Sequence, residues 1–289
     1  MTLAEATSTA RFGVRRLAAG FGAEITGLDI AAPLDAGTVA ALREAFDHHL
    51  VLLFRRQQLP PEAHIAFTRH FGELEVHVLD EYHASAHPEI FVLTNVGPDG
   101  KPHGAHPDRG TLFWHTDASF QRRPALATLL YAEEVPRDGG HTMFADMLGA
   151  WDALPASERQ RLEHLRVVHD LNLSRLEAGY KPMSEAQRAK APPVEHPLVR
   201  THPPTGRKGI YIGHHAHTVV GMEPHEGQGT LAWLTAHISQ PALVYDHVWQ
   251  PGDLVMWDNR AVLHRGTPYD TSLERRVVRR TVLKGDAPY

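Results

Sequence analysis

The sequence predicts a mostly β protein with covering α-helices, whose core is a double-stranded β-helix, the jelly-roll or cupin-like arrangement. Two observations carry this prediction. Short apolar runs bounded by turn residues outnumber helical patterns along the chain. None of these runs is followed by the glycine-rich phosphate loop that a doubly wound nucleotide-binding fold needs. With 289 residues, of which 42% are hydrophobic, the chain can bury such a core without disulfides.

Five strand-like runs support the β core. Each is rich in aliphatic or aromatic residues and has the length of an ordinary strand. They are VLLF at 51–54, IFVLT at 90–94, LATLLY at 126–131, GIYIG at 209–213 and DLVMW at 253–257. Many short strands separated by turns are typical of a sandwich or a closed barrel.

Three helical patterns are expected to cover this core. They run from Val39 to Leu50, over 61–71 and from Leu231 to Ile238. In the first and third, apolar residues recur at spacings of three and four. The second opens with a proline, which a helix tolerates in its first turn. Since no internal repeat or long linker interrupts the chain, we expect a single domain over residues 1–289.

Composition narrows the class of function. The chain has no cysteine, so any bound metal must be held by nitrogen and oxygen. A net charge of −5 with dispersed basic residues argues against nucleic acid as a partner. We find neither a signal peptide nor an apolar run long enough to cross a membrane, and therefore expect a cytoplasmic protein that acts on small molecules.

A metal site is predicted where histidine and aspartate share one face of a strand. The chain has 22 histidines, so spacing must select among them. In WHTDASF, His115 and Asp117 are two apart and therefore project to the same side of a strand. His264 follows a strand signal 147 positions later (264 minus 117). Two histidines and one carboxylate are the ligand set of non-haem Fe(II) oxygenases.

Two arginines downstream of His264 suggest that the site takes anions. Arg275 and Arg279 follow it by 11 and 15 positions (275 and 279 minus 264). Being four apart on a predicted strand, they project to the same face. A guanidinium matches a carboxylate at two points, so each arginine could anchor one anionic group.

The ordered motifs resemble those of the TauD/TfdA family of Fe(II)/2-oxoglutarate dioxygenases. The resemblance covers nearly the whole chain and is closest to the 2,4-dichlorophenoxyacetate dioxygenase type. It is carried by GAEITGLDI, LVLLFRRQQLPPEAHIAFTRHFGELE, WHTDASF, GGHTMFADMLGAWDALP, HPLVRTHPPTGRKGIYIG, GDLVMWDNRAVLHRG and RRVVRRTVL.

This resemblance implies an enzyme that uses Fe(II), 2-oxoglutarate and O2 to hydroxylate a small anionic substrate. It makes His115, Asp117 and His264 the iron ligands, Thr142 and Arg275 the residues that hold 2-oxoglutarate, and Arg279 the anchor of the substrate anion. Further substrate contacts are expected from His77, His202 and His215. The substrate type implied is a phenoxyalkanoate cleaved to a phenol, and a homo-oligomer, dimer or tetramer, is expected.

Two alternatives stay open at the level of sequence. A taurine, alkylsulfonate or alkylsulfate dioxygenase would share the iron and co-substrate sites and differ in the substrate anion. A non-catalytic metal-binding barrel would use the histidines but have no role for Arg275 and Thr142. The glycine- and proline-rich segment 97–113 lies just before His115 and could form a loop over the active site.

Overall fold

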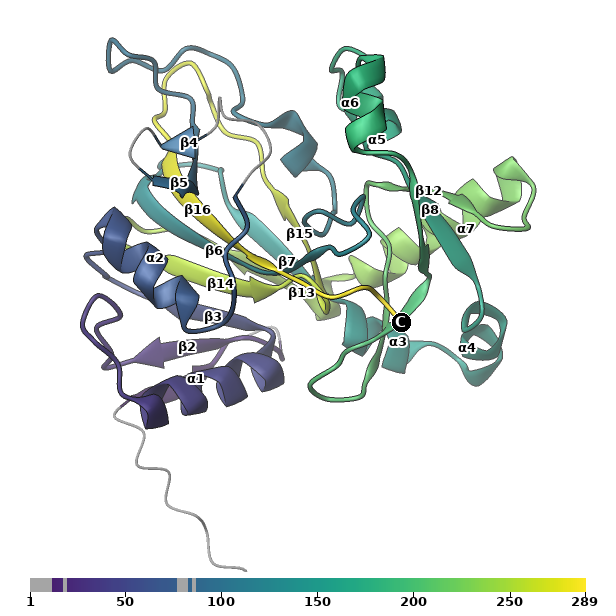
Figure 1. Cartoon of the computed structure of the whole chain (residues 1–289), viewed down its shortest axis with the longest axis horizontal. Helices are drawn as coiled ribbons and strands as arrows, with labels where there is room; N and C mark the ends of the chain where they lie inside the picture. The colour runs from purple at the N-terminus through teal and green to yellow at the C-terminus, as the bar shows by residue number, and fades with distance from the viewer. Residues whose placement is uncertain (1–11, 18–19, 77–82, 85–86) are drawn as a thin grey trace, which may run out of the picture.

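The computed structural model describes residues 12–17, 20–76, 83–84 and 87–289 (Figure 1). Its largest element is a sheet of eight strands, all neighbours antiparallel except the parallel pair β2 and β3. In order across the sheet the strands are β1 (Gly13–Arg16), β2 (Ala23–Thr26), β3 (Val51–Phe54), β14 (Leu254–Asp258), β6 (Ala125–Glu134), β16 (Val277–Lys284), β5 (His87–Thr94) and β4 (His83–Ala84).

Two helices cover one face of this sheet, α1 (Ala36–His49) and α2 (Pro61–Arg69) (Figure 1). Asp35 caps α1 by accepting a hydrogen bond from the Thr38 backbone at 2.8 Å. The apolar cluster beneath them joins Leu42 and Phe46 of α1 and Phe67 of α2 to alternate strand residues: Ala23, Ile25, Leu52, Phe54, Ala127, Leu129, Met256 and Leu283. The alternation follows from the two-residue period of a strand.

The opposite face packs on a second sheet of three antiparallel strands. Its order is β13 (Val244–His247), β7 (Thr142–Asp146) and β15 (Val262–Gly266). The intervening strand residues of the large sheet point this way and meet the small sheet in one cluster: Leu53, Leu130, Val255, Trp257 and Val278 with Phe144 and Val262. Two packed sheets with covering helices confirm the predicted fold class, and the described strands form open sheets rather than a closed barrel.

The remaining elements form a layer beyond the small sheet. They comprise β8 (Arg166–His169), β9 (Val194–Pro197) and β12 (Ala216–Val219) in one sheet, the hairpin β10 (Val199–Thr201) and β11 (Lys208–Ile210), and helices α3 (Met147–Ala153), α4 (Ala156–Leu162), α5 (Leu171–Glu177), α6 (Glu185–Lys190) and α7 (Pro224–Ile238). Two short 3-10 turns are η2 (Arg109–Leu112) and η3 (Pro241–Leu243). Leu263 of β15 joins the small sheet to this layer's apolar cluster.

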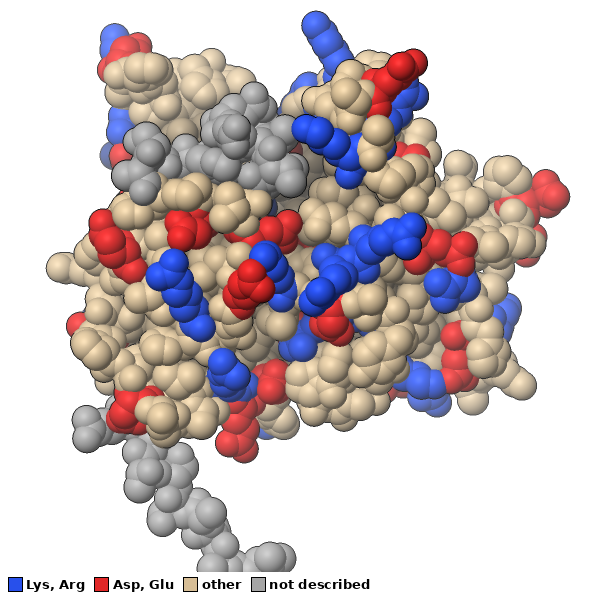
Figure 2. Space-filling view, in the orientation of Figure 1, with Lys and Arg blue, Asp and Glu red and all other residues tan. Residues whose placement is uncertain are grey.

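The surface charge and the helix lengths relate to two expectations from the sequence, that the chain does not bind nucleic acid and that it has no membrane span. On the face drawn in Figure 2, Lys and Arg are interspersed with Asp and Glu rather than gathered in one basic field. Among the described residues, every helix is too short or too polar to cross a membrane.

Candidate metal centre and active site

The predicted ligands His115, Asp117 and His264 lie together between the sheets. His264 is in the middle of β15, and His115 pairs with it through backbone hydrogen bonds of 3.0 and 2.8 Å. The two imidazole Nε2 atoms lie 3.9 and 3.8 Å from the Asp117 carboxylate, and all three residues are buried. The structure therefore brings the three predicted ligands to one point.

The geometry fits one metal ion. Both nitrogen–oxygen distances are shorter than twice a metal–ligand bond of about 2.1 Å, so a single ion can reach both partners. His115 Nδ1 lies 2.8 Å from the Phe113 carbonyl oxygen, which can only accept, so Nδ1 carries the proton. Its Nε2 is then left with a lone pair for a metal. Two imidazoles and a carboxylate suit Fe(II) with positions left for other ligands.

Asp117 and His264 are held in the protonation states that bind a metal. Burial raises the pKa of Asp117, but the interactions of its carboxylate with the side chains of His264, Arg280 and Thr128 outweigh this and hold the pKa well below its usual range. Burial, followed by the charge of His115, lowers the pKa of His264 well below its usual range. An anionic carboxylate and a neutral imidazole are what metal binding requires.

A network behind Asp117 fixes its carboxylate, and sequence reasoning did not identify it. Thr128 Oγ1 donates to Asp117 Oδ2 at 2.6 Å, and Asn259 Nδ2 donates to Thr128 Oγ1 at 2.9 Å. Trp257 Nε1 in turn donates to Asn259 Oδ1 at 3.0 Å. Such partners orient a metal ligand. Asn259 belongs to the motif GDLVMWDNR, which was the available signal.

Arg280 is the arginine that contacts the triad, and Arg276 precedes it by four residues. Arg280 Nη1 lies 3.5 Å from Asp117 Oδ1, and its guanidinium lies over the Phe91 ring at 4.6 Å. Arg276 is buried, which lowers its pKa, and no ion pair joins it to a carboxylate in the described part of the chain. Val278 lies between the two sheets, so side-chain alternation along β16 turns Arg280 to the same interior face.

Arg275 and Arg279 lie elsewhere. Arg275 is half-exposed, forms a two-point ion pair with Glu134 at 2.5 and 2.8 Å and also donates to the Gly100 carbonyl. Arg279 is buried on the opposite face of β16, where it pairs with Glu133 at 2.7 Å. No contact of either arginine with the triad is seen among the described residues, and alternation along β16 turns Arg280, rather than Arg279, toward Asp117.

Three further residues were predicted to bind the co-substrate or the substrate: Thr142, His215 and His77. Thr142 is buried at the start of β7 and accepts a hydrogen bond from Trp249 Nε1 at 3.0 Å. It is paired with Gly266, two positions after His264. His215 is close enough to His115 for that charge to add to burial in lowering the pKa of His215. His77 lies outside the described residues.

His202 belongs to a separate buried group and not to the metal triad. Its Nε2 lies 3.0 Å from Asp258 Oδ2, and its Nδ1 lies 2.7 Å from Thr205 Oγ1. Arg260 already pairs with Asp258 at two points, 2.8 and 2.6 Å. A cation is therefore in place, and the group needs no metal.

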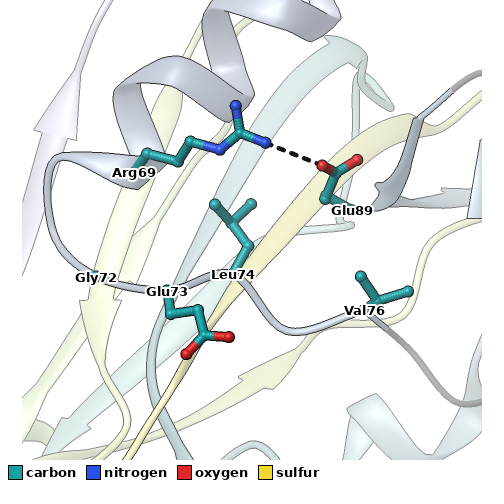
Figure 3. A pocket seen from close by; sticks show the side chains of 6 residues that line it. All are labelled: Arg69, Gly72, Glu73, Leu74, Val76 and Glu89. Atoms are coloured by element: carbon teal, nitrogen blue, oxygen red, sulfur yellow. Dashed lines mark hydrogen bonds and ion pairs between the residues drawn. The ribbon is translucent and has the colours of Figure 1, made fainter.

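A hollow of about 430 Å³ lies at the end of α2 (Figure 3). Its lining comes from the end of α2, the segment after it and β5: Arg69, Gly72, Glu73, Leu74, Val76 and Glu89. In Figure 3, Arg69 and Glu89 face each other across it in an ion pair of 3.1 Å. None of the predicted site residues that the structure describes lines it.

These features define a non-haem Fe(II) oxygenase. Residues 13–282 match the family model described as "Taurine catabolism dioxygenase TauD, TfdA family". The chain therefore belongs to the TauD/TfdA family, and it is a 2-oxoglutarate-dependent dioxygenase, an oxidoreductase that uses Fe(II) and O2.

Similar proteins extend this comparison. An alpha-ketoglutarate-dependent 2,4-dichlorophenoxyacetate dioxygenase of Cupriavidus pinatubonensis is 42% identical over 271 residues, covering 91% of this chain and 94% of that protein. An (S)-phenoxypropionate/alpha-ketoglutarate-dioxygenase of Sphingobium herbicidovorans is 36% identical, covering 95% and 96%. The crystal structure of AAD-2 in complex with Mn(II) and N-oxalylglycine matches with a TM-score of 0.86 and 36% identity, covering 96% and 99%.

Proposed function

We propose that this enzyme oxidises a phenoxyalkanoate at the carbon that bears the ether oxygen. The observation that carries this proposal is the 42% identity, over nearly the full length of both chains, to a 2,4-dichlorophenoxyacetate dioxygenase. Proteins named for sulfate esters are more distant, at 30% identity. A second dioxygenase named for 2,4-dichlorophenoxyacetate, at 39% identity, adds to this support.

We assign the iron to His115, Asp117 and His264, and the distal carboxylate of 2-oxoglutarate to Arg276 with Thr142. A buried guanidinium without a carboxylate partner is costly, and a bound dianion would neutralise it. Tyr269 lies near both residues: its ring is 3.5 Å from where a Cβ added at Gly140, two residues before Thr142, would lie, and it is close enough to Arg276 to oppose in part the lowering of the Arg276 pKa by burial. Arg275 has no such need, since Glu134 already neutralises it.

Arg280 is then the cation that faces the carboxylate groups nearest the metal. Its single long contact of 3.5 Å to Asp117 leaves most of its donors free, and its Nε is buried without a partner. A carboxylate of the substrate or of the co-substrate would satisfy these donors. We propose that Arg280, rather than Arg279, anchors the anion.

The products follow from which carbon reacts. With its ligands and O2 bound, the iron supplies the oxidising chemistry, in which 2-oxoglutarate becomes succinate and CO2 and one oxygen atom goes to the substrate. Hydroxylation beside the ether oxygen gives a hemiacetal, which splits into a phenol and a carbonyl acid. The protein's task is to place that carbon, because a fixed geometry decides which bond reacts.

The test is a panel of substrates assayed with Fe(II) and 2-oxoglutarate. We expect phenoxyalkanoates to stimulate succinate formation and to release one phenol per succinate. The competing function is a taurine, alkylsulfonate or alkylsulfate dioxygenase, which would instead release sulfite or sulfate. If sulfonates or sulfate esters stimulate succinate formation and phenoxyalkanoates do not, the proposal is wrong.

The cellular setting is part of the same proposal. We propose a cytoplasmic homo-oligomer, a dimer or tetramer, of a chain that folds as a single domain over residues 1–289. Light scattering should then give a mass of two or four times the chain mass of 32.1 kDa. A monomer mass would remove the oligomer from the proposal without affecting the chemistry.

A further inference from the structure

We propose that Tyr180 is a positioning residue, which locks the segment 97–113 onto α5 and so holds the aromatic wall beside the metal centre. The inference rests on the proposed function in one respect, that the wall contacts an aryl group. The lock itself is a matter of contacts within the chain and can be tested without knowledge of the substrate.

The lock is made by the hydroxyl and the ring of Tyr180. Its hydroxyl accepts a hydrogen bond from the Arg109 backbone at 2.8 Å and donates to Asp108 Oδ1 at 3.1 Å. Burial raises the pKa of Tyr180, so the hydroxyl keeps the proton that it donates. The guanidinium of Arg109 lies 4.8 Å from the ring centre and that of Arg175 lies 5.0 Å from it.

On one side of the lock, the segment 97–113 leads directly to a metal ligand. The carbonyl of Phe113 accepts the hydrogen bond of His115 Nδ1 at 2.8 Å. The Phe113 ring, 40% exposed, stacks on His214 with ring centres 4.1 Å apart and planes within 7°. Movement of this segment would therefore move the Phe113 ring, which lies two positions before the metal ligand His115.

On the other side, α5 holds the same histidines. Ser174 of α5 accepts a hydrogen bond through its carbonyl from His214 Nε2 at 3.0 Å, and its hydroxyl lies 2.7 Å from His215 Nδ1. His215 in turn meets the Phe120 ring edge to face, with centres 5.1 Å apart. Phe113, His214, His215 and Phe120 thus form one aromatic wall, fixed from both sides. Aromatic pairs of this kind favour an aryl group as the neighbour.

Near Tyr180 the segment has one further hydrogen bond to the same region, which Arg109 Nη2 donates to the Gly179 carbonyl at 2.8 Å and which Tyr180→Phe would leave in place. Its far end is tied to the loop before β16, where Gly104 and Thr271 exchange hydrogen bonds of 3.1 and 2.9 Å and Arg275 donates to Gly100. Residues 99–105 and Arg109 are largely exposed, so apolar burial contributes little there. A segment held by a few polar contacts opens locally at low cost, which makes each contact measurable.

The experiment compares Tyr180→Phe with Tyr245→Phe. The Tyr180 variant loses two hydrogen bonds but keeps the ring between the two arginines. The Tyr245 variant loses a comparable hydrogen bond, 3.0 Å to His247 Nδ1, outside this wall. The first readout is trypsin cleavage after the exposed Arg109, measured on metal-free protein. We expect cleavage about 10-fold faster in Tyr180→Phe and unchanged in Tyr245→Phe.

The second readout is kinetic. In Tyr180→Phe we expect KM for a phenoxyalkanoate to rise about 5-fold to 10-fold and the ratio of succinate to phenol to rise above one, while KM for 2-oxoglutarate stays within about 2-fold. Equal cleavage rates in Tyr180→Phe and wild type overturn the lock. Faster cleavage with unchanged kinetics overturns its positioning role. If the wild-type enzyme does not oxidise phenoxyalkanoates but Tyr180→Phe is still cleaved faster than wild type, the proposed function is wrong and the lock stands.

Discussion

Two clusters of histidine and carboxylate lie within the described part of the chain, and we propose a metal at only one of them. His115, Asp117 and His264 bring their ligand atoms within 4.8 Å of one another, and so do Asp47, His202 and Asp258. Both clusters combine histidine with aspartate at metal-binding distances, with two histidines and one aspartate in the first and one histidine and two aspartates in the second. The difference lies in what each cluster already holds.

In the second cluster, the guanidinium of Arg260 occupies the place that a metal cation would take. It binds Asp258 at two points, while His202 bonds to Asp258 on one side and to Thr205 on the other. At the triad, Arg280 makes only one contact, of 3.5 Å, with Asp117. A cluster whose carboxylate is neutralised within the chain is a structural ion pair, whereas one left with unused lone pairs can take a metal.

The largest effect that tests this comparison is loss of activity in Asp117→Ala. Removing the only anionic ligand should lower kcat/KM on the order of 1,000-fold, equal to about 4 kcal/mol, because two histidines alone hold Fe(II) poorly. The measurement is succinate formation together with metal titration. The variant should unfold near the wild-type midpoint in metal-free buffer. More than one-tenth of the wild-type activity would remove Asp117 from the metal site.

The second cluster should respond to the equivalent change through stability and not through chemistry. Asp258→Ala leaves Arg260 and His202 buried without their shared partner, which should lower the free energy of unfolding by about 3–5 kcal/mol. Urea denaturation measures this loss. The control is Asp152→Ala, which breaks an exposed ion pair with Arg207 and should cost at most about 1 kcal/mol. Equal losses in both variants would contradict the comparison.

A smaller effect is expected on KM for 2-oxoglutarate when Arg276 is replaced, and replacement of the neighbouring Arg275 serves as the control. Arg276→Gln should raise KM for 2-oxoglutarate about 10-fold to 150-fold, because a charge-assisted hydrogen bond is worth about 1.5–3 kcal/mol. Arg275→Gln, one residue earlier, should change it less than about 3-fold, since that side chain pairs with Glu134 near the surface. A larger effect in Arg275→Gln than in Arg276→Gln would restore the role in 2-oxoglutarate binding that the family resemblance implies for Arg275.

The triad could be predicted from sequence, whereas the choice of arginines could not. His115 and Asp117 are two positions apart, so their closeness is local to the chain. The structure nevertheless differs from the predicted strand: His115 forms an isolated β-bridge with His264, and Asp117 lies in the turn that follows. In RRVVRR, by contrast, both arginine pairs are four apart with valines between them, and the alternation is set by contacts made elsewhere. Asn95 decides it in part: its side chain accepts from the Arg276 backbone at 2.8 Å and donates to the carbonyls of Thr271 and Glu274.

The ends of strands and helices also could not be predicted from the sequence. The run 209–213 is predicted as one strand, but β11 ends at Ile210 and the chain then turns toward the metal site. At Gly213, with φ +139°, an added Cβ would lie 3.1 Å from His115 Cα, so a close backbone approach ends the strand. The helix predicted over 61–71 ends at Arg69. Periodicity finds the elements, and tertiary contacts set where they stop.

The smallest expected effect concerns a buried histidine with neither metal nor carboxylate partner. Burial, followed by the charge of Arg279, lowers the pKa of His64 to about 3. Because the folded pKa lies below the unfolded one, near 6.5, this histidine contributes stability above about pH 6.5 that is lost as pH falls toward 3. The loss is about 1.4 kcal/mol per pH unit, or about 2 kcal/mol between pH 6.5 and 5. In His64→Gln, the plot of unfolding free energy against pH should be shallower by that slope over this range. An unchanged slope would mean that His64 takes up its proton without unfolding, and that burial alone does not keep a histidine of this protein neutral.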